Sequence, residues 1–112
     1  SGNRRAHLWE NAKQLHAGLK NAGFTMATNK AESPIIAVCL PDLHQATLFW
    51  EELILAGVYV NMAAGFATPG GVNLMRASIC AQHTSEQIDL IIDRFIKTAK
   101  KVNLPLTNIA AE

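Results

Sequence analysis

Hydrophobic residues recur at helical spacing in three stretches of the chain. The first stretch covers residues 4–22, the second lies between Asp42 and Gly57, and the third follows Thr84 and ends before Leu104. In each of them apolar side chains stand three or four residues apart, which is the period of one helix face. The clearest stripe belongs to the third stretch and consists of Ile88, Ile91, Ile92, Phe95, Ile96 and Ala99. The pattern therefore predicts three amphipathic helices.

Capping signals support two of these helix starts. Asp42 is followed three residues later by Gln45, and Thr84 is followed in the same way by Gln87. This spacing is that of a capping box, in which the two residues satisfy backbone N–H groups at the helix N-terminus. We predict that Asp42 and Thr84 are the N-caps of the second and third helices.

Other apolar runs have the length and composition of strands. Residues 34–40 and 72–80 form two such runs, residues 58–60 form a short one, and residues 24–27 offer an optional fourth. The resulting order, α, β, α, β, β, α, favours the α+β class. We predict a small two-layer sandwich, with a mainly antiparallel three-stranded or four-stranded sheet and three helices packed on one face. The other face of the sheet is then left for solvent or for another domain.

Composition narrows the functional classes. The chain has 112 residues, of which 49% are hydrophobic, and this suits a single domain over residues 1–112 with a real core. A formal net charge of +1 gives no indication of the basic surface that binds nucleic acid. No apolar run approaches the roughly 20 residues that span a bilayer, and no signal-peptide pattern is present. We expect a cytoplasmic protein without a transmembrane segment.

Cysteines and histidines give no metal-binding pattern. Cys39 and Cys80 lie in strand-like surroundings without CxxC or CxxH spacing, and the histidines lack the spacing of a zinc site. We interpret the cysteines as reduced core thiols and expect no metal. A disulfide or metal role for them stays open as the alternative.

The two ends of the chain differ from the rest. Residues 1–2 are interpreted as a remnant of cloning, and helical sequence begins abruptly after them. Residues 103–112 follow the last helical pattern and are interpreted as a tail. We expect the chain to be an excised piece of a longer protein.

One charged residue stands inside a predicted strand. Strand alternation puts Arg76 on the same face as Leu74 and Ser78. Burying a guanidinium is unfavourable unless an anion and further hydrogen bonds meet it. One explanation is an intramolecular salt bridge or an edge strand that lets the side chain reach water. The other is a fork for a carboxylate, whose two oxygens match the guanidinium geometry.

Residues 61–71 form a loop rich in glycine and alanine. The loop matches neither of the glycine-rich phosphate-binding motifs. Its glycines permit large backbone changes, so we interpret the loop as a mobile lid that covers a bound ligand. A plain hairpin connection is the alternative.

Residues 74–88, LMRASICAQHTSEQI, resemble the LRxSxxAxHTxxQI signature of the α-oxoamine synthases. These are pyridoxal-phosphate (PLP) enzymes of the fold-type I aminotransferase superfamily. Residues 7–24, 33–40 and 57–63 are similar to the C-terminal domain of the bacterial serine palmitoyltransferases. The resemblance extends from about residue 4 to residue 102, nearly the whole chain.

The resemblance implies an acyltransferase reaction of the kind that makes sphingoid bases. An amino acid, serine in this group, condenses with an acyl-CoA thioester and carbon dioxide is lost. The cofactor is bound by a lysine of a large domain that this chain lacks, so we expect no cofactor-binding or catalytic residue here and an inactive fragment. The implied partners are that large domain and the second subunit of a homodimer.

The resemblance also assigns substrate-binding residues. Arg76 matches the family arginine that receives the carboxylate of the amino acid. The loop that closes over the substrate corresponds to Ala64, Gly65, Phe66, Ala67, Thr68 and Pro69. Serine palmitoyltransferases and the biotin-pathway synthase usually have Arg-Pro-Pro where this chain has residues 64–66, so the loop arginine is absent. A stand-alone, non-catalytic α/β ligand-binding or regulatory module stays open as the alternative function.

Overall fold

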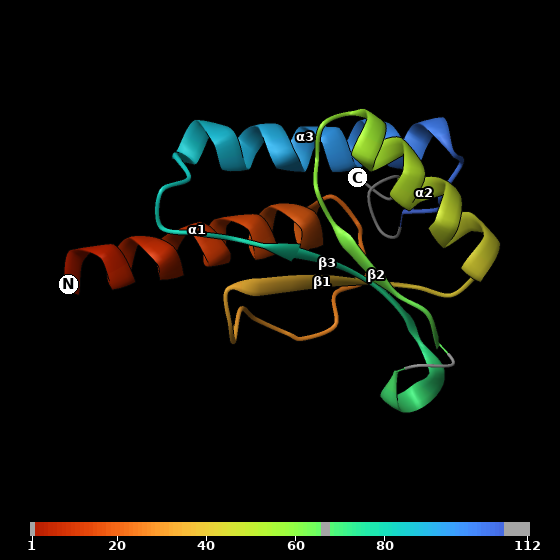
Figure 1. Cartoon of the computed structure of the whole chain (residues 1–112), viewed down its shortest axis with the longest axis horizontal. Coiled ribbons are helices and arrows are strands. Elements are labelled where there is room, and N and C mark those ends of the chain that lie inside the picture. The colour runs from red at the N-terminus through yellow and green to blue at the C-terminus, as the bar shows by residue number, and fades with distance from the viewer. Residues whose placement is uncertain (1, 66–67, 107–112) are drawn as a thin grey trace.

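The computed structural model describes residues 2–65 and 68–106 and contains three helices packed against a small sheet (Figure 1). Its elements in chain order are α1 (Gly2–Asn21), β1 (Ile35–Leu40), α2 (Leu43–Leu55), β2 (Asn61–Ala63), the short 3-10 helix η2 (Pro69–Gly71), β3 (Asn73–Ser78) and α3 (Ser85–Lys101). The three helices predicted from hydrophobic spacing are all present.

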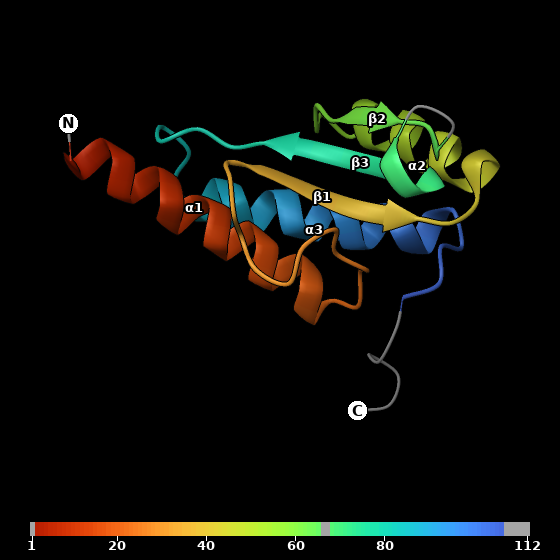
Figure 2. The same cartoon turned by 90° about the horizontal axis from the view of Figure 1, so that it is seen from below.

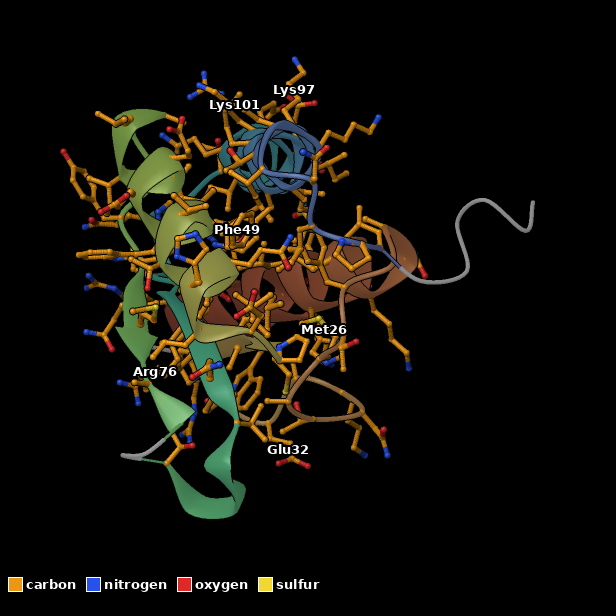
Figure 3. The ribbon with its side chains drawn as sticks, turned by 90° about the vertical axis from the view of Figure 1, so that its right-hand side faces the viewer. Met26, Glu32, Phe49, Arg76, Lys97 and Lys101 are labelled. Atoms are coloured by element: carbon orange, nitrogen blue, oxygen red, sulfur yellow. The ribbon has the colours of Figure 1, made fainter. Side chains whose placement is uncertain are left out.

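The sheet has three antiparallel strands in the order β1-β3-β2. β3 is therefore the central strand, although it comes last of the three in the sequence. The helices lie on one side of the sheet, as Figures 2 and 3 show from two directions. The predicted α+β sandwich, with helices on one face and the other face open, is confirmed.

Alternation along the strands decides which side chains face the helices. In β1 the residues Ile36, Val38 and Leu40 are buried. In β3 the buried residues Ala77 and Met75 lie opposite Ile36 and Val38, respectively. Three aromatic rings fill the space between the helical segments, with Phe24, Phe49 and Phe95 each within 6.0 Å of the others by ring centroid. The core is therefore a single cluster between the sheet and the helices.

The short strand was predicted at residues 58–60, and this was wrong by three residues, because β2 begins at Asn61. Gly57 has a positive φ of 91°, and the N–H of Val58 donates to the carbonyl of Leu53. These residues thus close the C-terminus of α2 in a Schellman-type turn. The carbonyl of Val60 then accepts a hydrogen bond from the indole of Trp50 at 3.0 Å. Strand pairing therefore begins at Asn61, the residue that follows these contacts in the sequence.

One of the two predicted capping boxes is present. Thr84 and Gln87 form the reciprocal pair at the start of α3. At the start of α2, Asp42 is the N-cap as predicted, but Gln45 does not complete a box. Its amide instead donates to the carbonyls of Val102 and Asn103 (2.9 Å for the latter), at the C-terminus of α3. The contact is possible because the start of α2 lies beside the end of α3.

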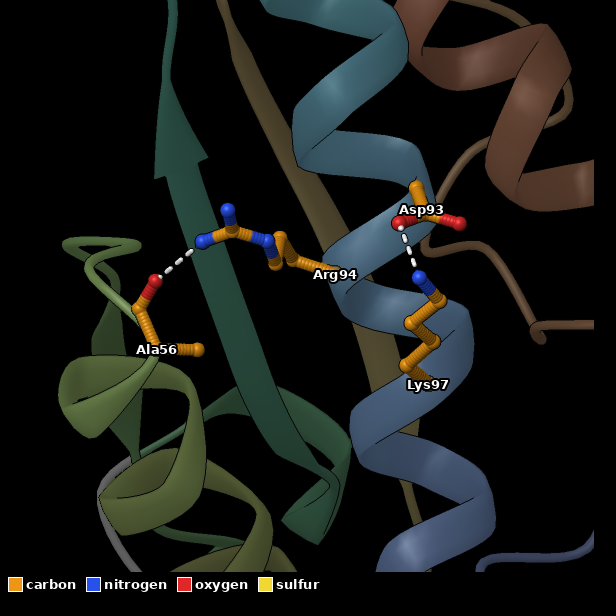
Figure 4. A network of polar contacts seen from close by, with 4 residues as sticks. All are labelled: Ala56, Asp93, Arg94 and Lys97. Carbon is orange, nitrogen blue, oxygen red and sulfur yellow. Dashed lines mark hydrogen bonds and ion pairs between the residues drawn. The ribbon is translucent and has the colours of Figure 1, made fainter.

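A second contact joins α2 and α3 near the opposite end of α2. Arg94 of α3 donates from Nη1 to the carbonyl oxygen of Ala56, 2.5 Å away (Figure 4). Asp93 and Lys97, one helical turn apart, form an exposed ion pair nearby at 3.1 Å. Arg94 thereby satisfies a carbonyl at the C-terminus of α2, where a cation also complements the helix dipole.

Two predicted segments have a different extent. The optional fourth strand at residues 24–27 is reduced to an isolated bridge between Met26 and Val38. Residues 103–106 were predicted as the start of a tail, but Leu104 is buried and its N–H donates to the carbonyl of Ala99, while Asn103 and Pro105 are exposed. Asn103 reaches this turn with a positive φ of 58°. Residues 107–112 lie outside the described part of the chain.

Within the described residues, none of the helices combines the length and the apolar character needed to cross a membrane.

Candidate functional site

Arg76 lies on the open face of the sheet, in the middle of its central strand. In the register, Ala37 of β1 is opposite Arg76 on one side and Asn61 of β2 is opposite it on the other. The side chain is exposed and points away from the helices (Figure 3). The face predicted from alternation, shared with Leu74 and Ser78, agrees with this register. Arg76 is also the one charged residue in the three strands.

The surroundings of Arg76 test the two explanations for its charge. The ion pairs within the described residues join Asp93 to Lys97 and Glu52 to Lys101, and neither includes Arg76. The strand is central, so the edge-strand explanation was wrong. Arg76 instead donates from Nη2 to Oδ1 of Asn61 at 2.5 Å. A neutral amide oxygen leaves the positive charge uncompensated, which suits the binding of an anion.

The predicted substrate loop, Ala64 to Pro69, follows β2 directly. Phe66 and Ala67 lie outside the described residues. Thr68 donates from its hydroxyl to the carbonyl of Val72 at 2.6 Å, and its N–H donates to the carbonyl of Gly65 at 3.2 Å. The loop therefore starts at the strand that carries Asn61 and returns into the strand that carries Arg76.

The two ends of this loop meet at a narrow neck formed by Gly65, Gly71 and Asn73. Oδ1 of Asn73 accepts a hydrogen bond from the N–H of Gly65 at 2.6 Å, and Nδ2 donates to the carbonyl of Leu40 at 3.0 Å. A Cβ atom at position 65 would lie 2.4 Å from the carbonyl oxygen of Gly71. Only a residue without a Cβ fits there while both backbones keep their places.

Replacing Gly65 with alanine is therefore expected to open the neck. The obstructing atoms belong to the backbone, and overpacking of this kind costs about 1–3 kcal/mol of stability. Hydrogen exchange measured by NMR should show the amide of residue 65 losing protection as its bond to Asn73 breaks. Gly70→Ala is the control, because a Cβ there meets nothing within 4 Å and adds only the strain of a positive φ of 80°. Equal protection of the residue-65 amide in both variants would contradict the inference that a Cβ atom at position 65 opens the neck.

Three asparagines of structural importance were not singled out from the sequence. Asn61 and Asn73 have been described above, and Asn11 of α1 donates from its buried amide to the carbonyls of Cys80 (3.0 Å) and His83 (2.9 Å). Asn11 thereby fixes the turn that follows β3. Asparagine is common in loops and at surfaces, so its type alone does not separate these positions from others. The signal for Asn73 is its place in a predicted strand, where a buried amide needs partners.

The thiols and histidines give no second site. Cys39 is half-buried, and burial raises the pKa of its thiol. Cys80 is exposed, so its prediction as a core thiol was wrong, because β3 has already ended at Ser78. Its N–H donates to Nδ1 of His83 at 3.1 Å. Both cysteines are free, and no cluster of ligands for a metal ion occurs among residues 2–65 and 68–106.

Comparison with known proteins assigns this arrangement to a family of enzymes. Residues 2–95 match the family model described as aminotransferase class I and II. The serine palmitoyltransferase of Sphingomonas paucimobilis is 45% identical over 101 residues, which make up 90% of this chain and 24% of that protein. The 8-amino-7-oxononanoate synthase of Thermosipho melanesiensis is 34% identical over 104 residues, 93% of this chain and 26% of that protein.

A solved structure is similar to the same extent. The serine palmitoyltransferase of Sphingomonas wittichii superposes with a TM-score of 0.88 at 44% identity, over 92% of this chain and 26% of that one. The chain thus spans about a quarter of the length of the relatives it matches. These relatives are PLP-dependent α-oxoamine synthases, so the family resemblance inferred from residues 74–88 is confirmed.

Proposed function

Because this chain belongs to the aminotransferase class I and II family, we propose that it is the C-terminal domain of a PLP-dependent α-oxoamine synthase. The complete protein would condense an amino acid with an acyl-CoA and release carbon dioxide. We propose serine as the amino acid, because the relatives are named serine palmitoyltransferases. The identities of 45% and 44% with two serine palmitoyltransferases, against 34% with an 8-amino-7-oxononanoate synthase, support serine and a palmitoyl donor as the substrate pair.

One observation carries the proposal for this chain: Arg76 presents an uncompensated positive charge on an otherwise uncharged sheet face. A planar guanidinium binds a carboxylate through two parallel hydrogen bonds. The role of Arg76 would be to fix the carboxylate of the amino acid. That contact orients the bonds around Cα, and orientation of this kind contributes strongly to catalysis.

The lysines of this chain do not fit the role of a cofactor-binding lysine. Lys13 and Lys20 are exposed on α1, Lys30 is exposed in the connection before β1, and the other three are exposed on α3. None of them belongs to the sheet face that carries Arg76. We therefore assign PLP to a large domain outside this chain and expect the isolated chain to be inactive.

The same assignment names the partners. The open face of the sheet would meet the large domain, and the complete protein would be a homodimer in the cytoplasm. The free state of Cys39 and Cys80 is consistent with a reducing compartment.

The experiment is an activity assay on the complete protein, expressed from the full coding sequence around this chain. With PLP present, we expect release of labelled carbon dioxide from carboxyl-labelled serine only when a long-chain acyl-CoA is added. The isolated 112-residue chain should release none. Activity with glycine and not with serine would contradict the substrate assignment. Absence of activity with any amino acid, together with saturable ligand binding by the isolated chain, would favour the non-catalytic module.

A further inference from the structure

We propose that Asn61 is a positioning residue for Arg76, which holds the guanidinium in the orientation that receives a carboxylate. The inference rests on the proposed role of Arg76. It adds a residue on a second strand to the substrate site, and with it a reason for the polar residue at the start of β2.

The geometry supplies the first argument. Asn61 and Arg76 are direct register partners on neighbouring strands and share the open face of the sheet. Oδ1 of Asn61 accepts from Nη2 of Arg76 at 2.5 Å. On the other side of Arg76, the register partner Ala37 has only a methyl group to offer. Among the described residues, Asn61 is thus the side chain that forms a hydrogen bond with this guanidinium and can orient it.

The chemistry of the acceptor supplies the second argument. A guanidinium has five N–H donors, and Asn61 uses one of them. The remaining donors on Nη1, Nη2 and Nε still allow a two-point contact with a carboxylate. Because the amide is neutral, it restricts a long and otherwise mobile side chain without reducing the positive charge that attracts the anion.

An acidic residue at position 61 would behave differently. Aspartate has nearly the same shape as asparagine and also accepts from Nη2. Its charge, however, would pair with Arg76 and repel an incoming carboxylate. A role in positioning for an anion therefore predicts that aspartate is worse than alanine, whereas a merely structural hydrogen bond predicts that aspartate is better.

The test uses steady-state kinetics on the complete protein with Asn61→Ala, Asn61→Asp and Arg76→Ala. Asn61→Ala should raise the KM for the amino acid about tenfold, at the lower end of what a hydrogen bond to a charged group contributes. Asn61→Asp should raise it further, and neither variant should change the KM for acyl-CoA. Asn21→Ala is the matched control, since Asn21 is exposed at the end of α1. Circular dichroism should show all variants folded.

The outcomes separate this inference from the proposed function. If Arg76→Ala leaves the amino-acid KM unchanged, the carboxylate role of Arg76 fails, and the inference fails with it. If Arg76→Ala raises that KM while Asn61→Ala does not, only the positioning role is overturned. A KM for Asn61→Asp below that of Asn61→Ala would also overturn it, because a structural bond would then explain both variants.

Discussion

Replacing Phe49 with alanine is expected to lower the free energy of unfolding of this chain by about 3–5 kcal/mol. Phe49 is 0% exposed, and its ring centroid lies 5.7 Å from that of Phe95 and 6.0 Å from that of Phe24. Truncation removes the ring that joins α2 to α3 and to the segment after α1. Since small domains are stable by only about 5–15 kcal/mol, a large share of the stability is lost.

Urea denaturation followed by tryptophan fluorescence measures this loss. Leu55→Ala is the control on the same helix, because Leu55 is 79% exposed and its truncation should change the stability by less than about 0.5 kcal/mol. Phe49→Leu should fall between the two, since it keeps much of the buried volume. A loss below about 1 kcal/mol for Phe49→Ala would mean that the three rings do not form the centre of the core.

The helices were predictable because their hydrophobic period is local information. The stripe on α3 and its capping box follow from residues at most four apart, and both are present. The position of β2 was not predictable in the same way. Residues 58–60 have the composition of a strand, but Trp50 and the end of α2 use their backbone groups first. Local propensity yielded there to tertiary contacts.

In the candidate site, too, the features set by local pattern were predictable and those set by register or tertiary contact were not. Strand alternation was enough to place Arg76 on one face with Leu74 and Ser78. Its partner Asn61 was not identified, because a cross-strand partner depends on register, and register depends on where β2 begins. The neck at Gly65 likewise requires knowing that residues 65 and 71 approach each other, and no spacing rule encodes that contact. Motif resemblance gave the chemistry of the site but not its supporting residues.

Arg76→Ala in the complete protein is expected to raise the KM for the amino acid about 30- to 100-fold, the lower part of the range for removing one partner of an ion pair. The lower part applies because Arg76 is exposed and solvent screens its charge. The effect is not shared with a loop arginine, since residue 64 is alanine. Arg76→Lys should be intermediate, because lysine keeps the charge and loses the two-point fork.

The measurement should separate binding of the carboxylate from every other role. The absorbance of the bound cofactor and the KM for acyl-CoA should not change in Arg76→Ala. The free energy of unfolding of the isolated chain should change by less than about 0.5 kcal/mol, because the side chain is exposed and packs in no core. An amino alcohol that lacks the carboxylate should bind wild type and variant equally well. If it too binds more weakly to Arg76→Ala, the arginine acts through the shape of the site and not through the carboxylate.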